Sequence, residues 1–341
     1  MKHIIRLSLA AAACALTLQA QEPAAAKAPV EGTLTQFLDR NSKEVAPQVA
    51  RLTQEVFLLK TELNILSFRS EYGDRIKMQR VWFPANTADH EAIPGYIFTP
   101  INLPAGKKLP AIVMVHGGNH IQLSDEWFGY IAEAISRGFV VLYPEYRGSS
   151  GYDETIYENN YGVTDVADVL AGAAYFAKKE FVDSTRMGIL GHSRGGMVTL
   201  NAIEHEPKRF KAAVNIAGLS DLVAFMGYKA EARRQDIASQ KNFGGKTPDK
   251  NLPAYMDVSP ALFVEKIEAP LLLLSTTGDK TVPYQLHNKR MGEALKAYGK
   301  TFDSHLYELA PGGHEFAFMD SDEGHDAKKR TFDWFVKYLA P

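Results

Sequence analysis

Gly191-His192-Ser193-Arg194-Gly195-Gly196 is the stretch of sequence on which the fold prediction rests. An apolar run at 187–190 precedes it, and apolar residues recur at helical spacing over 197–203. A strand, the pattern G-x-S-x-G and a helix, in this order, are typical of a nucleophile elbow, a sharp turn that lifts a serine hydroxyl above a sheet. Glycines on both sides of Ser193 leave room for the strand and the helix to approach each other. Because the pattern is weak by itself, its weight depends on the rest of the chain.

Apolar runs and helical patterns alternate along the chain from about residue 77. We expect strands at 80–83, 96–99, 111–115, 139–143, 187–190, 212–216, 271–275 and 304–309. We expect helices at 126–136, 163–179, 196–204, 286–298 and 327–339. This alternation predicts an α/β fold, with a mostly parallel, doubly wound sheet and helices on both of its faces. Ligands of such sheets bind at the carboxyl ends of the strands.

The alternation breaks between residues 219 and 255. This insert is rich in cationic and aromatic side chains, including Lys229, Arg233, Phe225 and Tyr228. Its position between two strands suits a lid over the pocket. The alternative is a solvated helical excursion, because charge runs usually form solvated faces.

Two further residues complete the arrangement that a serine nucleophile requires. A serine hydroxyl needs a base, and the base needs an acid that orients it; in hydrolase sheets the chain order is serine, acid, histidine. Asp279 follows the apolar strand at 271–275, and His314 follows the last strand between Gly313 and Glu315. We therefore predict Ser193 as nucleophile, His314 as general base and Asp279 as the group that orients the imidazole.

Other acids and histidines fit this order less well. His325 stands among acids where a helix is expected to begin. Asp303 lacks a preceding strand, and Asp257 precedes the strand that it would have to follow. Three residues in the correct order, each at the end of a strand, favour the first assignment.

Acyl transfer also needs hydrogen-bond donors for the oxyanion. We predict the backbone N–H of Arg194 as one donor and the loop after the strand at 111–115 as the source of the other. The candidates in that loop are His116, Gly118 and Asn119. His116 and His120 are four residues apart, but zinc pairs of this spacing lie on a helix, so we expect no metal and no other cofactor. The side chains of His192 and Arg194 either contact substrate or pack beside it.

The chain resembles the α/β-hydrolase superfamily, and within it the catalytic domain of prolyl oligopeptidase-like (S9-type) serine peptidases, from about residue 77 to 341. The motifs that carry the resemblance are His116-Gly117-Gly118, the stretch PEYRGSSGY at 144–152, DSTR at 183–186, the elbow at 191–196, Ser259-Pro260, Gly278-Asp279 with Val282-Pro283, and Gly313-His314. The resemblance implies an α/β-hydrolase fold and hydrolysis of peptide or amide bonds through an acyl-enzyme on Ser193.

The chain departs from these peptidases in three respects. They usually carry a β-propeller, but the ~50 residues between the expected signal and the hydrolase domain cannot form one, because a single blade takes about 40–45 residues. Arg194 stands where the family often has tyrosine, and His116 stands where some members place a tyrosine. Relatives resembling dienelactone hydrolases and acyl esterases share the triad. The alternative is therefore a carboxylesterase that acts on small or carbohydrate-linked esters.

The N-terminus has the features of a secretory signal. Lys2 and Arg6 precede an apolar run at 7–18 that is too short to span a bilayer. We predict a signal peptide at 1–20, export to the periplasm or the extracellular space, and an Ala/Pro-rich flexible linker at 21–32. Cys14, the only cysteine, faintly suggests a lipoprotein site instead.

Residues 33–70 are expected to form a helical extension before a catalytic domain at 71–341. Seven apolar residues lie alternately four and three apart, which defines a heptad-like seam over about three repeats. They are Val45, Val49, Leu52, Val56, Leu59, Leu63 and Leu66. The seam predicts either a coiled coil, through which the chain self-associates, or a single amphipathic helix packed on the following domain. Because Phe57 and Leu58 lie off the seam, a broader buried face and hence the second interpretation is favoured.

Composition limits the class of partner. The formal net charge of the chain is −2, and it becomes more negative without Lys2 and Arg6. A protein with this balance lacks the basic footprint of a nucleic-acid binder. We expect a small-molecule or short peptide substrate, no nucleic acid and no integral membrane span.

Overall fold

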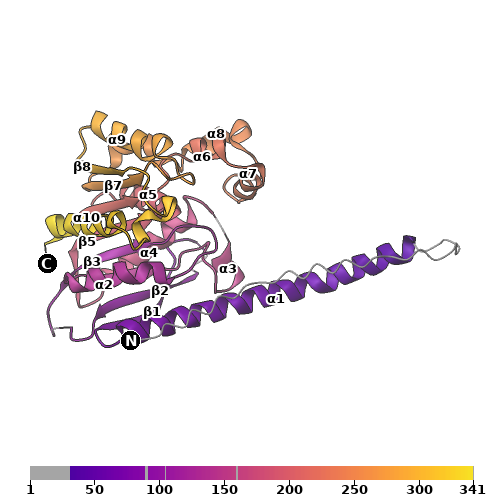
Figure 1. The fold of residues 1–341 in the computed structure, drawn as a ribbon, viewed down its shortest axis with the longest axis horizontal. Coiled ribbons are helices and arrows are strands. Elements are labelled where there is room, and N and C mark those ends of the chain that lie inside the picture. Colours follow the sequence, from indigo (N-terminus) through magenta and orange to yellow (C-terminus); the bar gives the residue numbers. More distant parts are fainter. Residues whose placement is uncertain (1–30, 89–90, 104, 159, 341) are drawn as a thin grey trace. The chain divides into compact units, whose positions relative to one another are not determined.

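The computed structural model describes residues 31–88, 91–103, 105–158 and 160–340 (Figure 1). The expected signal peptide at 1–20 and nearly all of the linker at 21–32 lie outside these residues. The chain divides into two units, 1–52 and 53–341. Within the described ranges, no helix combines the length and the apolarity needed to cross a membrane.

Eight strands form one sheet within the described residues. They are β1 (Ile76–Pro84), β2 (Ala92–Pro100), β3 (Leu109–Val115), β4 (Val140–Pro144), β5 (Val182–His192), β6 (Ala212–Ile216), β7 (Leu271–Thr276) and β8 (Phe302–Tyr307). Their order in the sheet is β1-β2-β4-β3-β5-β6-β7-β8. β2 pairs with β1 and β4 in antiparallel fashion, and all other pairs are parallel. The predicted strands and the mostly parallel sheet are confirmed.

Helices cover both faces of this sheet. The α-helices outside the insert are α1 (Glu31–Tyr72), α2 (Phe128–Ser136), α3 (Glu154–Tyr157), α4 (Thr164–Phe176), α5 (Arg194–His205), α9 (Asn288–Ala297) and α10 (Asp322–Leu339). The 3₁₀ turns are η1 (Asp125–Trp127), η2 (Pro260–Leu262), η3 (Val264–Lys266), η4 (Tyr284–Leu286) and η5 (Gly313–Phe318).

The strand residues alternate between two hydrophobic clusters. In β3, Val113 and Val115 pack with α4, α5 and α9, whereas Ile112 and Met114 pack with α2, α10 and Phe68 of α1. Burying an aliphatic or aromatic side chain stabilises a fold by about 1.5–3 kcal/mol. These two clusters therefore hold the central strands, and the loops at their carboxyl ends, in a fixed place.

The insert forms a packed cap, which we define as residues 219–258. Its helices are α6 (Leu222–Tyr228), α7 (Glu231–Ala238) and α8 (Pro248–Met256). Phe225, Ile237 and Tyr255 of these helices share a hydrophobic cluster with Met197 of α5. The solvated-excursion alternative is therefore wrong, because the insert has its own buried side chains.

Helix α1 uses only part of its apolar surface within the second unit. Phe68 is fully buried against Phe98 and Phe128, at ring-centroid distances of 4.9 and 5.0 Å. Ile65 is also buried. The seam residues of this unit, in contrast, are 60–70% exposed; they are Val56, Leu59, Leu63 and Leu66. The helix does pack on the following domain, but the expectation that it buries the seam there is wrong.

Candidate active site

The elbow holds Ser193 in a backbone conformation that few non-glycine residues adopt. Ser193 connects β5 to α5 with φ 58° and ψ −121°. A Cβ at Gly195 would lie 2.2 Å from the carbonyl oxygen of Val115, and a Cβ at Gly191 would lie 2.1 Å from that of Gly195. Such distances exclude any side chain, so the glycines of the motif allow strand, turn and helix to pack this closely.

The three predicted catalytic residues, Ser193, His314 and Asp279, are joined by hydrogen bonds in one arrangement, which we call the relay. The Ser193 hydroxyl lies 2.8 Å from His314 Nε2, although 121 residues separate the two in sequence. His314 Nδ1 lies 2.7 Å from Asp279 Oδ2. The other carboxylate oxygen of Asp279 accepts the backbone N–H groups of Thr281 and Val282, each at 2.8 Å. These two bonds fix the carboxylate, which in turn fixes the imidazole ring.

A cavity of about 240 Å³ opens beside Ser193 and His314. Its lining includes Ser193, His314 and Arg194 together with Gly117 and Gly118. A Cβ at Gly117 would lie 2.8 Å from that of Ser193, so the loop at 116–120, which we call the glycine loop, passes directly against Ser193. Of the predicted oxyanion residues, the structure thus brings Arg194 and Gly118 to the cavity.

The other two predicted oxyanion residues have side chains engaged elsewhere. The His116 ring is fully buried and stacks on Tyr146 at 4.4 Å. Its Nδ1 donates to the carbonyl of Gly117 at 3.0 Å, and its Nε2 lies 3.0 Å from Ser149 Oγ. Asn119 instead accepts a hydrogen bond from the Tyr161 hydroxyl at 2.6 Å. Both side chains therefore support the loop.

The side chain of Arg194 is buried beneath the cavity and does not extend across it. Its guanidinium donates to the Asp165 carboxylate at 2.9 Å and lies 4.1 Å from the centroid of the Tyr161 ring. Burial of a charged pair is tolerated only where both partners are hydrogen-bonded. Of the two interpretations of Arg194, packing beside the substrate pocket agrees with this geometry.

Sequence reasoning missed Asp165 and Asp168. Both lie in α4 and are fully buried, and Asp168 pairs with Arg147 at 2.7 Å. Burial raises the pKa of Asp168 to about 6 even though Arg147 opposes the shift. The sequence did contain an indication of these pairs. Two acids stand within an otherwise apolar helical segment, and acids on a buried face need cationic partners.

Hydrogen bonds also connect the glycine loop to the cap. Arg233 of α7 donates to the Tyr161 hydroxyl at 2.8 Å and to Asp236 at 2.6 Å. Asn119 donates to the same Asp236 carboxylate at 3.3 Å. Arg194, through its contact with Tyr161, joins this network to the elbow.

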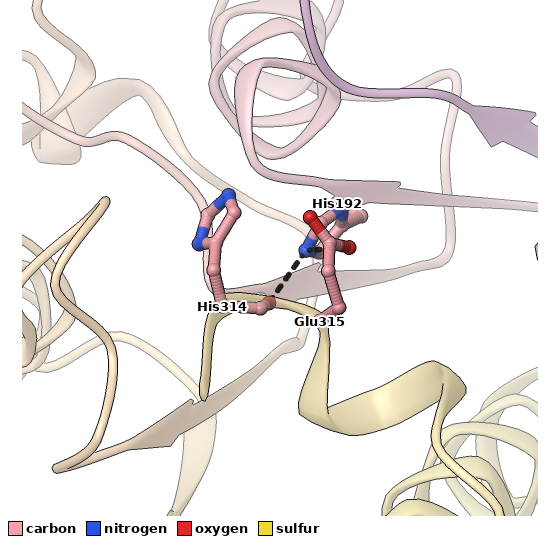
Figure 2. Close-up of side chains that lie close together, drawn as sticks. All are labelled: His192, His314 and Glu315. Carbon is pink, nitrogen blue, oxygen red and sulfur yellow. Dashed lines mark hydrogen bonds and ion pairs between the residues drawn. The ribbon is translucent and has the colours of Figure 1, made fainter. Parts of the chain in front are cut away.

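His192 precedes Ser193 and lies beside His314, with a distance of 4.8 Å between the two ring centroids. Its Nε2 donates to the His314 carbonyl at 2.9 Å and lies 3.6 Å from the Glu315 carboxylate, as Figure 2 shows. Burial, with a smaller contribution from His314, lowers the pKa of His192 to about 3. His192 is therefore neutral and holds the backbone of the loop that carries His314.

His192, His314 and Glu315 also place possible metal-ligand atoms within 4.8 Å of one another. However, the two ring nitrogens of His314 face Ser193 and Asp279, and Nε2 of His192 donates to a carbonyl. A metal ion would have to break these bonds. The cluster is better explained as part of the serine site.

Charged side chains of both signs line the cavity. The acids are Glu126 of η1 and Glu315 of η5, and burial raises the pKa of each. The bases are Lys229 and Arg233 of the cap, and burial together with Arg233 lowers the pKa of Lys229. The lid hypothesis is supported to this extent: the cap contributes side chains to the cavity wall.

The sequence profile of the prolyl oligopeptidase family matches residues 127–341. The chain belongs to this family. The match includes the elbow, Asp279 and His314, and it begins at the end of η1. The predicted family is therefore confirmed.

Individual relatives agree with this assignment. The acylamino-acid-releasing enzyme of Mus musculus is 28% identical over 202 residues, which are 58% of this chain and 27% of that enzyme. The uncharacterized peptidase YuxL of Bacillus subtilis (strain 168) is 28% identical over 239 residues, 67% of this chain and 35% of that protein. The chain thus spans between about a quarter and about a third of the length of these curated relatives.

A solved structure confirms the fold. A puromycin-hydrolyzing peptidase of Mycobacterium tuberculosis superposes with a TM-score of 0.65 at 26% identity. The similarity covers 77% of this chain and 39% of that one. The α/β-hydrolase fold expected from the elbow is the fold of this peptidase domain.

Proposed function

We propose that this protein is an exported serine peptidase that cleaves amide bonds in short peptides through an acyl-enzyme on Ser193. The observation that carries the proposal is the hydrogen-bonded chain from Ser193 through His314 to Asp279, with distances of 2.8 and 2.7 Å. The alignment of these three side chains also argues against a binding module without catalytic activity, because binding alone requires no such alignment.

The proposed reaction follows from the direction of these hydrogen bonds. Ser193 Oγ attacks the carbonyl carbon of the scissile bond while its proton passes to His314 Nε2, and Asp279 stabilises the resulting imidazolium. The tetrahedral intermediate collapses as the amine leaves with that proton. Water, deprotonated by His314, then attacks the ester carbonyl and releases the acid and the free serine.

We assign the oxyanion donors to the backbone N–H groups of Arg194 and Gly118. A trans peptide is planar, with its C=O and N–H on opposite sides. The carbonyl of Gly117 faces the buried His116 ring, so the N–H of Gly118 points the other way. In this proposal the His116 side chain positions the donor and does not itself contact the oxyanion.

The expected substrate is a short peptide. A cavity of about 240 Å³, lined by Glu126 and Glu315 as well as Lys229 and Arg233, suits a compact substrate that carries charges of both signs. The relatives are named as an acylamino-acid-releasing enzyme and as peptidases, and these names favour amide substrates over the esters of the alternative. The features of residues 1–20 support export.

A paired substrate panel tests the activity. Aminoacyl and short peptidyl nitroanilides are compared with p-nitrophenyl esters of the same acyl groups, using wild type and Ser193→Ala. We expect Ser193-dependent turnover of the amides and Ser193-dependent labelling by a fluorophosphonate. Turnover of esters alone would support the carboxylesterase alternative, and the absence of labelling would overturn the enzyme hypothesis.

Export is tested separately, by cell fractionation and N-terminal sequencing of the mature protein. We expect the protein outside the cytoplasm with a new N-terminus near residue 21. A chain that retains residues 1–20 in the cytoplasm would contradict this part of the proposal alone.

A further inference from the structure

The exposed seam of α1 has the composition of a coiled-coil interface. With Val49 placed at heptad position a, the a positions are Val49, Val56 and Leu63, and the d positions are Val45, Leu52, Leu59 and Leu66. β-Branched residues at a, combined with leucine at d, favour parallel two-stranded coiled coils. Each of these seven side chains is 51–70% exposed.

The same helix is attached to its own catalytic domain by other heptad positions. At f, Thr61 is hydrogen-bonded to the side-chain amide of Gln122 at 2.7 Å, and Phe68 is buried. At b, Asn64 donates to the carbonyl of Leu123 at 2.7 Å, and at c, Ile65 is buried. Position f is diametrically opposite the a/d seam, and b and c flank it. Within the second unit, packing on the domain therefore leaves the seam residues Val56, Leu59, Leu63 and Leu66 for another occupant.

We propose that a second copy of this chain occupies the seam and forms a parallel, two-stranded coiled coil through residues 45–66. A second copy is the simplest partner with a matching repeat, because an identical helix supplies the same a and d knobs at the same heights. Burying a leucine that is otherwise exposed contributes about 1.5–3 kcal/mol, so the d positions supply much of the driving force.

Charge complementarity favours the parallel orientation. In a parallel pair, a g residue lies beside the e residue that is five positions further along the partner helix. Glu55 is at g and Lys60 is at e, so each copy would face Glu55 to Lys60 of the other. An antiparallel pair would instead bring together the g residues Glu55 and Glu62, which are both acidic, and Glu62 already pairs with Arg80 of its own domain at 3.0 Å. Both Glu55 and Lys60 are exposed.

The first test is the mass of the full-length protein in solution, measured by sedimentation over a dilution series. We expect a dimer for wild type, a monomer for Leu59→Glu and a dimer for the matched control Leu58→Glu. Leu58 is an adjacent leucine that is 47% exposed but lies at position c. Circular dichroism and the melting temperature verify that both variants are folded.

The second test is the orientation of the helices. A single cysteine, Leu66→Cys in a Cys14→Ser background, should oxidise to a covalent dimer, because parallel packing sets identical d residues side by side. Leu58→Cys should remain uncrosslinked. Lys60→Glu should raise the dissociation constant, and the exchange Glu55→Lys with Lys60→Glu should restore it.

Each other outcome overturns the proposal. A monomeric wild type would show that the seam binds a different partner or none. A dimer that survives Leu59→Glu would place the interface elsewhere. A dimer in which Leu66→Cys fails to crosslink would exclude the parallel arrangement.

Discussion

The catalytic relay and the cap are held in place by different means. Ser193, His314 and Asp279 stand on short connections from strands that lie between two large hydrophobic clusters. The cap has a separate, smaller cluster and reaches the glycine loop through the hydrogen bonds of Tyr161 and Arg233. The difference teaches that Ser193, His314 and Asp279 depend on the core of the sheet, whereas the part of the cavity wall that the cap contributes depends on a smaller cluster and a few hydrogen bonds.

The largest effect is expected within the relay. Asp279→Asn should lower kcat by about 10⁴-fold, because an amide no longer holds the imidazole in the tautomer that accepts the serine proton. The asparagine carbonyl oxygen can still accept the N–H groups of Thr281 and Val282, so the fold should remain. Single-turnover assays and circular dichroism measure the two expectations. A fall of less than tenfold would remove Asp279 from the relay.

Arg194 connects the elbow to the network of Tyr161 and Arg233 that reaches the cap. Arg194→Met should lower the free energy of unfolding by about 3–5 kcal/mol, because Asp165 is then left charged and buried without its partner. Adding Asp165→Asn should recover much of this loss. Urea denaturation measures both. If the single and double variants had the same free energy of unfolding, the loss in Arg194→Met would not come from an unpaired, buried Asp165 carboxylate.

The contribution of His192 to the free energy of unfolding should depend on pH. His192 has a pKa of about 3 when folded and about 6.5 when unfolded, so only the unfolded chain gains a proton between these values. The contribution to stability is complete above pH ~6.5 and is lost, at about 1.4 kcal/mol per pH unit, as the pH falls toward 3.

Replacing His192 should remove this part of the slope. His192→Gln keeps a donor for the His314 carbonyl but has no titrating ring. Unfolding free energies at about pH 7 and about pH 5 should therefore differ less in the variant than in wild type. His287, whose pKa burial lowers to about 4, adds a slope of the same sign in both proteins. The exposed His325→Gln is the control, and an unchanged slope in His192→Gln would contradict the assignment.

The smallest effect is expected in the cap. Arg233→Gln should raise KM for peptides with a free C-terminal carboxylate by up to about fivefold and leave kcat nearly unchanged, because partly exposed ion pairs contribute about 0.2–1 kcal/mol. Arg234→Gln is the matched control, since Arg234 is similarly exposed and pairs within α7 with Glu231. A larger change in kcat than in KM would place Arg233 in the chemistry and erase the distinction between the regions.

The sheet could be predicted because buried parallel strands are continuous apolar runs. The boundaries were less visible where the first residues of an element are polar. β5 begins at Val182, five residues before the predicted start, because the polar stretch 183–186 continues the strand. α10 begins at Asp322, with Ser321 as its N-cap, so its polar first turn lacks the apolar spacing that indicated a helix from 327.

That Ser193, Asp279 and His314 meet could be predicted because each of these residues follows a strand in a fixed order. The pair of Arg194 with Asp165 could not, because it depends on how α4 lies against α5 and no local pattern encodes that packing. The face of α1 that packs on the domain was also wrongly predicted. That helix carries two apolar faces, and the more regular one is not the one that is buried.

The backbone of Ser193 has one more consequence. A serine at φ 58° and ψ −121° costs of order 1–3 kcal/mol relative to a residue at ease there. Glycine adopts this conformation with little strain, so stability alone would favour glycine at position 193. The fold instead keeps serine in this strained conformation, so stability is given up at the turn that presents the Ser193 hydroxyl to the cavity.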